Sequence, residues 1–187
     1  MILLIAGVLL WSGLHLLPVA IRGPRQGLVD RLGEGGYKGI FSLLMLAAIA
    51  LMGFGWRGAQ PSYMYSPSYE MRWAGIILTV IAFVLMAAAN RPSRIGRLVR
   101  HPQLTGVLAW AVAHLLANGD SRSLVLFGGF AIWSAITIVL INRRDGAWQK
   151  PEPPSWIREI VGILIGVAVW GLFVAIHRWI AGVAVIF

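Results

Sequence analysis

Cysteine is absent from this 187-residue chain, and charged residues are scarce. Without cysteine the protein has no disulfide, no thiolate ligand for haem, no iron–sulfur cluster and no C-x-x-C-H site for covalent haem attachment. Charged residues make up 12% of the chain and hydrophobic residues 58%, with a mean hydropathy of +0.77. This balance excludes an ordinary soluble domain. The sequence contains no Walker loop, dinucleotide fingerprint, H-E-x-x-H or G-x-S-x-G motif.

Long apolar runs dominate the sequence instead. Their lengths are close to the roughly 20 residues that a helix needs to cross the hydrocarbon core of a bilayer. The sequence therefore predicts an all-α, polytopic integral membrane bundle of about six transmembrane helices, in a single domain over residues 1–187. The expected helices are Ile2–Ile21, Tyr37–Trp56, Met71–Asn90, Pro102–Ala117, Arg122–Asn142 and Trp156–Arg178.

Positive charge is in excess and is unevenly distributed. The chain has 16 Lys and Arg residues against 7 Asp and Glu residues, and 12 of the basic residues fall in alternate connections between the apolar runs. By the positive-inside rule these connections face the cytoplasm and both termini face outward. Anionic lipid headgroups are the expected partners of this charge, and nucleic acid is not. The basic residues are Arg22, Arg25, Arg31, Lys38, Arg91, Arg94, Arg97, Arg100, Arg143, Arg144, Lys150 and Arg158.

Two connections contain residues that typically end or begin helices. In the first connection, Gly23-Pro24 and Gly33–Gly36 predict turns, because glycine and proline interrupt helices. In the fourth connection, Asn118-Gly119 is expected to end a helix, and Asp120 or Ser121 is expected to cap the next one.

Two histidines lie inside the apolar runs, where an ionisable side chain is costly and points to a functional site. His15 and His114 each follow a tryptophan, Trp11 and Trp110, by four residues, which places the indole and the imidazole on one helix face. This pattern favours b-type haem, with iron ligated by His15 and His114 and with the two tryptophans as flat walls. The alternative is a pair of neutral histidines bonded across helices, with tryptophans packed in the core. His177 is expected to reach water at the outer interface.

His101 is a candidate catalytic residue at the cytoplasmic end of the fourth expected helix. It either caps the helix and contacts headgroups, or it transfers protons or contacts an anion. It does not share a helix face with His114, because 13 positions correspond to roughly 220° around a helix. The depth of His15 differs from that of either residue by roughly 9 Å, so depth leaves the choice of second ligand open. Arg22, Arg97 and Arg100 are the expected cationic partners of the haem propionates.

Several of these residues form motifs that are similar to those of a known family. In these motifs the chain resembles the NnrU membrane proteins, whose relatives include the plant and cyanobacterial 15-cis-ζ-carotene isomerase. The resemblance covers nearly the whole chain. It is carried by His15 before Arg22, by Gly36–Leu43, and by Arg100-His101-Pro102-Gln103 followed by Gly106, Trp110 and Ala113-His114.

The resemblance implies two functions. The isomerase branch implies a b-type haem between two histidines, matched in position by His15 and His114, with His101 as a further functional histidine and a lipid-soluble polyene as substrate. The bacterial branch implies a sensor, carrier or accessory factor for nitrite and nitric oxide reduction. In a bacterium the expected location is the inner membrane, where the positive-inside rule places both termini in the periplasm. Because Leu115–Asp120 is more similar to the bacterial branch, this role is the first expectation and haem-dependent cis–trans isomerisation is the alternative. Whether the protein is an enzyme stays open.

The Arg-His-Pro element at 100–102 also occurs in membrane isoprenylcysteine-type methyltransferases. No pocket for an adenosyl cofactor is recognisable in the sequence, so this third interpretation is the least favoured.

Overall fold

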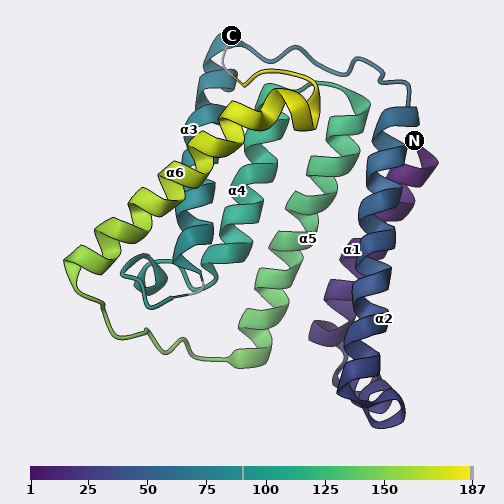
Figure 1. Cartoon of the computed structure of the whole chain (residues 1–187), viewed down its shortest axis with the longest axis vertical. Helices are drawn as coiled ribbons and strands as arrows, with labels where there is room; N and C mark the ends of the chain where they lie inside the picture. The colour runs from purple at the N-terminus through teal and green to yellow at the C-terminus, as the bar shows by residue number, and fades with distance from the viewer. Residues whose placement is uncertain (90, 186–187) are drawn as a thin grey trace. The chain divides into compact units, whose positions relative to one another are not determined.

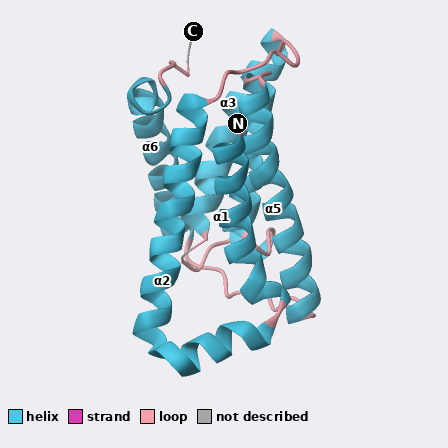
Figure 2. Ribbon diagram, turned by 90° about the vertical axis from the view of Figure 1, so that its right-hand side faces the viewer, coloured by secondary structure: helices cyan, strands magenta, loops and turns pink. Residues whose placement is uncertain are grey.

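The computed structural model describes residues 1–89 and 91–185, without the side chains of Arg22 and Pro24. Its regular structure is helical throughout, and the described residues form no strand (Figure 2). This confirms the predicted all-α fold. The elements, in chain order, are α1 (Ile2–Ala20), α2 (Arg22–Gly58), α3 (Tyr69–Ala88), the 3-10 helix η1 (Ile95–Arg97), α4 (Pro102–Ala117), α5 (Ser121–Asp145) and α6 (Trp156–Ala181) (Figure 1).

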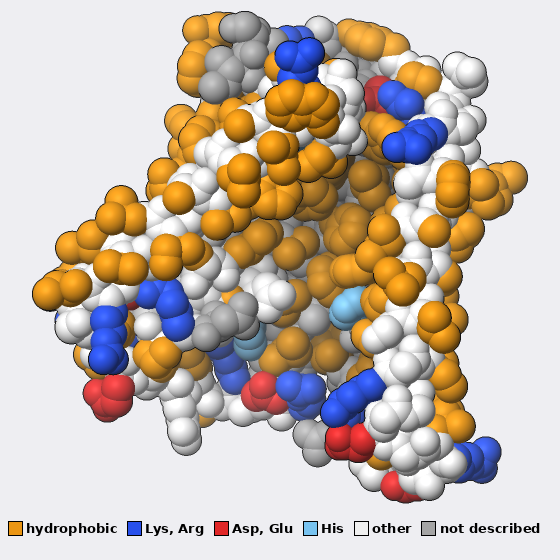
Figure 3. Space-filling model, in the orientation of Figure 1, with side chains coloured by type: hydrophobic (Ala, Val, Ile, Leu, Met, Phe, Trp, Pro, Cys, Tyr) orange, Lys and Arg blue, Asp and Glu red, His pale blue; other side chains and the backbone are white. Residues whose placement is uncertain are grey.

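Five of these helices, namely α1, α2, α3, α5 and α6, are long and apolar enough to cross a membrane. Helix α4 is apolar but shorter, with 16 residues. Hydrophobic side chains cover the visible flank of α6 (Figure 3), and Ile157, Leu164 and Leu172 on this helix are exposed. A continuous apolar surface of this kind is unfavourable in water but is matched by lipid, and a helix satisfies its own backbone hydrogen bonds there. The chain is therefore a multi-pass membrane protein.

The chain divides into two compact units. Unit 1 comprises Met1–Ser66 and Asn118–Arg144, and unit 2 comprises Pro67–Ala117 and Asp145–Phe187. In unit 1, glycines allow α1 and α2 to approach closely. A Cβ atom added to Gly7 would lie 2.9 Å from the carbonyl oxygen of Ala48, and one added to Gly55 would lie 2.7 Å from the Cα atom of Leu4. Such contacts replace the hydrophobic drive for helix association, which is missing in lipid.

In unit 2, α3 is the common partner of α4 and α6. A Cβ atom added to Gly106 of α4 would lie 2.9 Å from the carbonyl oxygen of Ala82 in α3. One added to Gly166 of α6 would lie 2.9 Å from the Cα atom of Val84, also in α3. Small residues at these two points therefore set how closely the three helices pack.

The first connection differs from the prediction. Arg22–Gly58 forms one helical element, interrupted only at Gly33, where φ is 71° and ψ is 163°. The turn predicted at Gly23-Pro24 is wrong, because these residues lie in the first turn of α2, where the missing N–H of proline would have no helical partner in any case. The break at Gly33 uses a positive φ that glycine adopts without steric cost.

The fourth connection agrees with the prediction, since Asp120 caps α5. Its carboxylate accepts hydrogen bonds from the backbone N–H of Arg122 (2.9 Å) and from the backbone N–H (3.2 Å) and Oγ (2.7 Å) of Ser123. Partial burial raises the pKa of Asp120, but these hydrogen bonds and the nearby Arg122 guanidinium outweigh it, so the pKa lies below its usual value. The same turn holds the segment before α3, because the backbone N–H of Tyr65 donates to the carbonyl of Gly119 (3.1 Å).

Candidate functional site

His15 lies in α1, within unit 1, and its ring is fixed by the preceding turn of the helix. The Nδ1 atom lies 2.9 Å from the carbonyl oxygen of Trp11. Because a carbonyl only accepts hydrogen bonds, Nδ1 carries the proton and Nε2 carries the lone pair of the neutral ring. The Trp11 ring lies beside the imidazole, with ring centroids 4.6 Å apart. The spacing of these two residues in the sequence thus becomes a direct contact.

Aromatic rings from two other helices complete the surroundings of His15. Trp133 of α5 and Phe41 of α2 lie with their ring centroids 5.4 Å and 5.7 Å from the imidazole. The indole N–H groups of Trp11 and Trp133 are buried and have no hydrogen-bond partner among the described residues. Buried donors are nearly always paired, so two unpaired ones beside one histidine call for a partner that the protein itself does not supply.

His114 repeats the same local arrangement in α4, within unit 2. Its Nδ1 atom lies 2.8 Å from the carbonyl oxygen of Trp110, and the two ring centroids are 4.8 Å apart. The proton is again on Nδ1 and the lone pair on Nε2. In both tryptophan–histidine pairs, one in each unit, Nε2 is therefore the ring nitrogen that carries the lone pair.

His177 of α6 is the histidine nearest to His114 in unit 2, with ring centroids 6.4 Å apart. Its Nδ1 atom lies 2.7 Å from the carbonyl oxygen of Val183, so it has the same tautomer as the other two histidines. His177 is thus an alternative ligand within this unit. No group of three or more His, Asp or Glu side chains that could hold a metal ion occurs in the described part of the chain.

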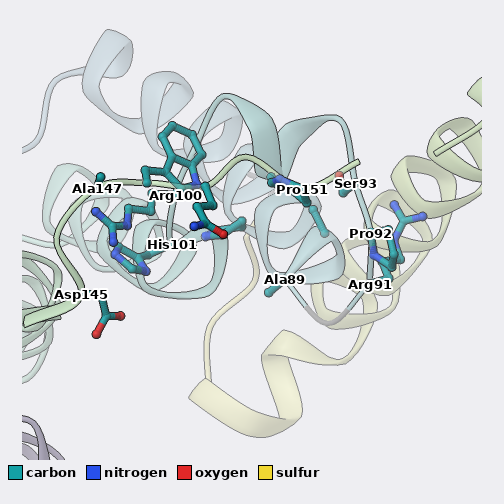
Figure 4. Close-up of a pocket in the computed structure, with 14 residues that line it drawn as sticks. Ala89, Arg91, Pro92, Ser93, Arg100, His101, Asp145, Ala147 and Pro151 are labelled. Carbon is teal, nitrogen blue, oxygen red and sulfur yellow. The ribbon is translucent and has the colours of Figure 1, made fainter. Parts of the chain in front are cut away.

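His101 lies apart from this pair, in the wall of a cavity of about 620 Å³ within unit 2. The walls are formed by the end of α3, residues 91–96, the start of α4 and residues 145–151. In Figure 4, Arg100, His101 and Asp145 lie at one end of the cavity, and Arg91 and Ser93 lie at the other. The predicted catalytic histidine therefore faces a space that is large enough for a ligand.

Arginines hold the walls of this cavity together. Arg100 donates from Nη1 to the carbonyl of Gly146 (2.7 Å), and Arg97 donates to the carbonyl of Pro151 (3.1 Å). These bonds tie the start of α4 and η1 to the segment before α6. The predicted role of Arg100 toward haem propionates stays a prediction, and the side chain of Arg22, its expected counterpart, lies outside the described residues.

Residues 91–96 are fixed by a carboxylate at the start of α6. Glu159 is 2% exposed and accepts hydrogen bonds from Ser93 Oγ (2.8 Å) and from the backbone N–H of Arg94 (2.9 Å). The backbone N–H of Ile95 is shared between Glu159 (3.3 Å) and Ser93 Oγ (3.1 Å). A buried carboxylate with this many donors keeps its charge and holds the segment in one conformation.

A family model described as NnrU protein matches residues 3–185 of the chain. The chain belongs to the NnrU family. The match runs through both units and includes both tryptophan–histidine pairs and the His101 cavity. Neither the comparison with curated proteins nor the comparison with solved structures finds a match.

Some residues of this NnrU-family site are not recognisable in the sequence. Phe41 and Trp133 are far from His15 in the chain and reach it only because α1, α2 and α5 pack together. The sequence contained only a weak indication that His177 lies close to His114. The two residues lie four and three positions before the last residues of α6 and α4, and the positive-inside rule predicts that both of these helix ends lie on the same side of the membrane.

Proposed function

We propose that this protein binds haem b with His15 and His114 as its protein ligands, and that it serves nitrite and nitric oxide reduction as a sensor, carrier or accessory factor. The observation that carries the proposal is the repeated pair in which a tryptophan carbonyl fixes Nδ1–H, so that the lone pair of the neutral ring is on Nε2. Ligating histidines are typically oriented in this way by a second hydrogen bond. Haem contributes its own nitrogen ligands, so a large protein cluster is not required.

The surroundings of His15 fit a flat, largely apolar group. Trp11, Trp133 and Phe41 offer aromatic faces and edges, and the two unpaired indole N–H groups offer donors to a polar substituent or to a small ligand. When bound, haem would supply a redox-active iron. The contribution of the chain is to orient the imidazoles and to keep water away from the iron.

Absorption spectra of protein purified from haem-replete cells test the ligand assignment. The wild type is expected to show a reduced-minus-oxidised haem b spectrum that is lost or strongly changed in His15→Ala and in His114→Ala. His177→Ala is the matched control and is expected to keep the spectrum. If His177→Ala abolishes the spectrum while His114→Ala preserves it, the ligand in unit 2 is His177. A featureless wild-type spectrum would refute haem binding.

The physiological role needs a separate assay. Deletion of the gene is expected to slow nitrite or nitric oxide consumption under denitrifying conditions, and the wild-type chain but not His15→Ala should restore it. Conversion of a cis-carotene to its trans isomer by the purified, haem-loaded protein would instead support the isomerase reaction. Unchanged nitrite and nitric oxide consumption in the deletion strain would contradict the first role.

We also propose that the protein lies in the bacterial inner membrane with both termini in the periplasm. The support is the concentration of Lys and Arg in alternate connections. Alkaline phosphatase, which is active only outside the cytoplasm, should be active when it is fused to the C-terminus and inactive when it is fused after Lys150. The opposite pattern would reverse the orientation.

A further inference from the structure

A small cavity lies in unit 1, between α1 and the first half of α2, and has a volume of about 120 Å³. Among the described residues that line it, Arg25 and Tyr37 are the polar ones and the others are apolar. Apolar cavities of similar volume, about 150 Å³, exclude water and bind small apolar groups. The space therefore suits a short stretch of hydrocarbon. Its apolar walls include Leu14 and Leu17 of α1 and Leu28, Leu32, Phe41 and Leu44 of α2.

Helix α2 is too long to cross the membrane as one straight helix. Its 37 residues would extend over about 55 Å, whereas the hydrocarbon core is about 30 Å thick. The break at Gly33 divides the helix. The part before the break, residues 22–32, runs across the end of α1 instead of continuing the line of α2 (Figure 2). This part is named the α2 arm.

The α2 arm has an apolar side and a polar side. Leu28 and Leu32 are four residues apart, which places them on one side of the helix, and both line the cavity. Gln26 and Asp30 are also four residues apart, and they are exposed and bonded to each other (2.8 Å). Two positions correspond to about 200° around a helix, so the two pairs lie on opposite sides. A helix with such sides is typical of a membrane surface, where the apolar side faces the lipid chains.

The cavity lies just below this surface and is open to lipid. Leu14 and Leu17 are six and three residues before Ala20, the last residue of α1, which corresponds to roughly 9 Å and 5 Å along the helix. The side chains of Leu17 and Leu28 are 46% and 44% exposed, so the walls do not close the cavity on all sides. In a membrane protein, the medium at this depth is the upper part of the lipid acyl chains.

We propose that this cavity holds the upper part of one acyl chain of a membrane phospholipid. The acyl chain contacts Phe41, which belongs both to the cavity wall and to the rings around His15. The guanidinium carbon of Arg25 lies 5.4 Å from the centroid of the Tyr37 ring, so the two polar lining residues interact with each other and leave the space to hydrocarbon. The site goes beyond the proposed function, because it requires neither haem nor a free positive charge.

Photocrosslinking of the full-length protein in phosphatidylcholine vesicles tests the proposal. The vesicles contain a trace of phosphatidylcholine with a diazirine near the carboxyl end of one acyl chain, and mass spectrometry identifies the crosslinked residues. In the wild type, crosslinks at Leu14 and Leu17 are expected to exceed those at Ile160 and Leu164 roughly tenfold, because a bound acyl chain stays at one place. Ile160 and Leu164 are exposed near the start of α6 and report contact with bulk lipid. Equal crosslinking at the two places would overturn the proposal.

Two variants that fill the cavity extend the test. Leu44→Trp is expected to abolish the excess of crosslinks, because a filled interior has no space for the acyl chain. Leu43→Trp is the matched control, since residue 43 is 68% exposed and is not among the lining residues, and it should keep the excess. Leu14→Trp, with the exposed Leu9→Trp as its control, repeats the comparison from α1.

An excess that persists in both filling variants would contradict the proposal, and so would an equal loss in the two controls. The comparison within the wild type needs no variant, so it remains decisive even if a filling variant does not fold. None of these measurements uses a haem signal. Failure of the lipid site and failure of haem binding are therefore distinguishable.

Discussion

Replacement of Glu159 by alanine is expected to destabilise unit 2 by about 3 kcal/mol. The carboxylate is buried and receives strong hydrogen bonds from Ser93 Oγ (2.8 Å) and from the backbone N–H of Arg94 (2.9 Å). A hydrogen bond to a charged group contributes about 1.5 kcal/mol or more. The bonds from Ser93 and Arg94 together therefore account for the expected loss of about 3 kcal/mol. The bond from the Ile95 N–H adds little, since this group also donates to Ser93 Oγ (3.1 Å) and keeps that partner.

The loss is measured by reversible unfolding in mixed micelles with increasing sodium dodecyl sulfate. Glu152→Ala is the matched control, because it removes the same side chain from an exposed position in the segment before α6. It should change the unfolding free energy by less than about 0.5 kcal/mol, as surface substitutions do. Hydrogen exchange at residues 91–96 should accelerate in Glu159→Ala only. If Glu159→Ala and Glu152→Ala unfold alike, the carboxylate does not hold this segment.

Three further predictions concern a cap, a helix contact and a histidine. Burial raises the pKa of the Asp120 carboxyl, but its hydrogen bonds hold this pKa below the value of about 4 in the unfolded chain. The ionised Asp120 therefore stabilises the fold above about pH 4, and this stabilisation is lost as the pH falls through the pKa in the folded protein. The difference in melting temperature between wild type and Asp120→Asn should therefore be largest near neutral pH and should close in acid. Gly166→Leu should lower the unfolding free energy by about 1–3 kcal/mol by overpacking, whereas Gly171→Leu on the same helix, where an added Cβ atom meets nothing within 4 Å, should not. His101→Ala should keep any haem spectrum but weaken nitric oxide consumption, and loss of the spectrum would make His101 the ligand.

The helices were largely predictable because lipid requires them. In hydrocarbon every backbone polar group must be satisfied within the segment, so a long apolar run becomes a helix. The fourth helix was predicted as Pro102–Ala117 and has those bounds. The first connection was not predictable in the same way, because glycine and proline are compatible with the first turn of a helix. Gly23 and Pro24 lie in the first turn of α2.

The candidate site was predictable as far as it depends on one helix at a time. A spacing of four residues is a contact within a helix, so Trp11 beside His15 follows from the chain alone. The ring of Trp133 and the orphaned indole N–H groups depend on how α5 packs against α1. Periodicity contains no information on such packing.

The sequence by itself determined the class of this protein, its apolar segments, the tryptophan–histidine pairs and its family, because these depend on composition, on sequence motifs or on spacing within one helix. Tertiary structure decided which aromatic rings surround His15, that His177 approaches His114, and that Arg91, Arg100 and His101 line one cavity. The physical reason is that helix contacts in lipid depend on a few small residues, such as Gly106 and Gly166, and on buried polar bonds such as those of Glu159. These contacts join parts of the chain that no local pattern relates.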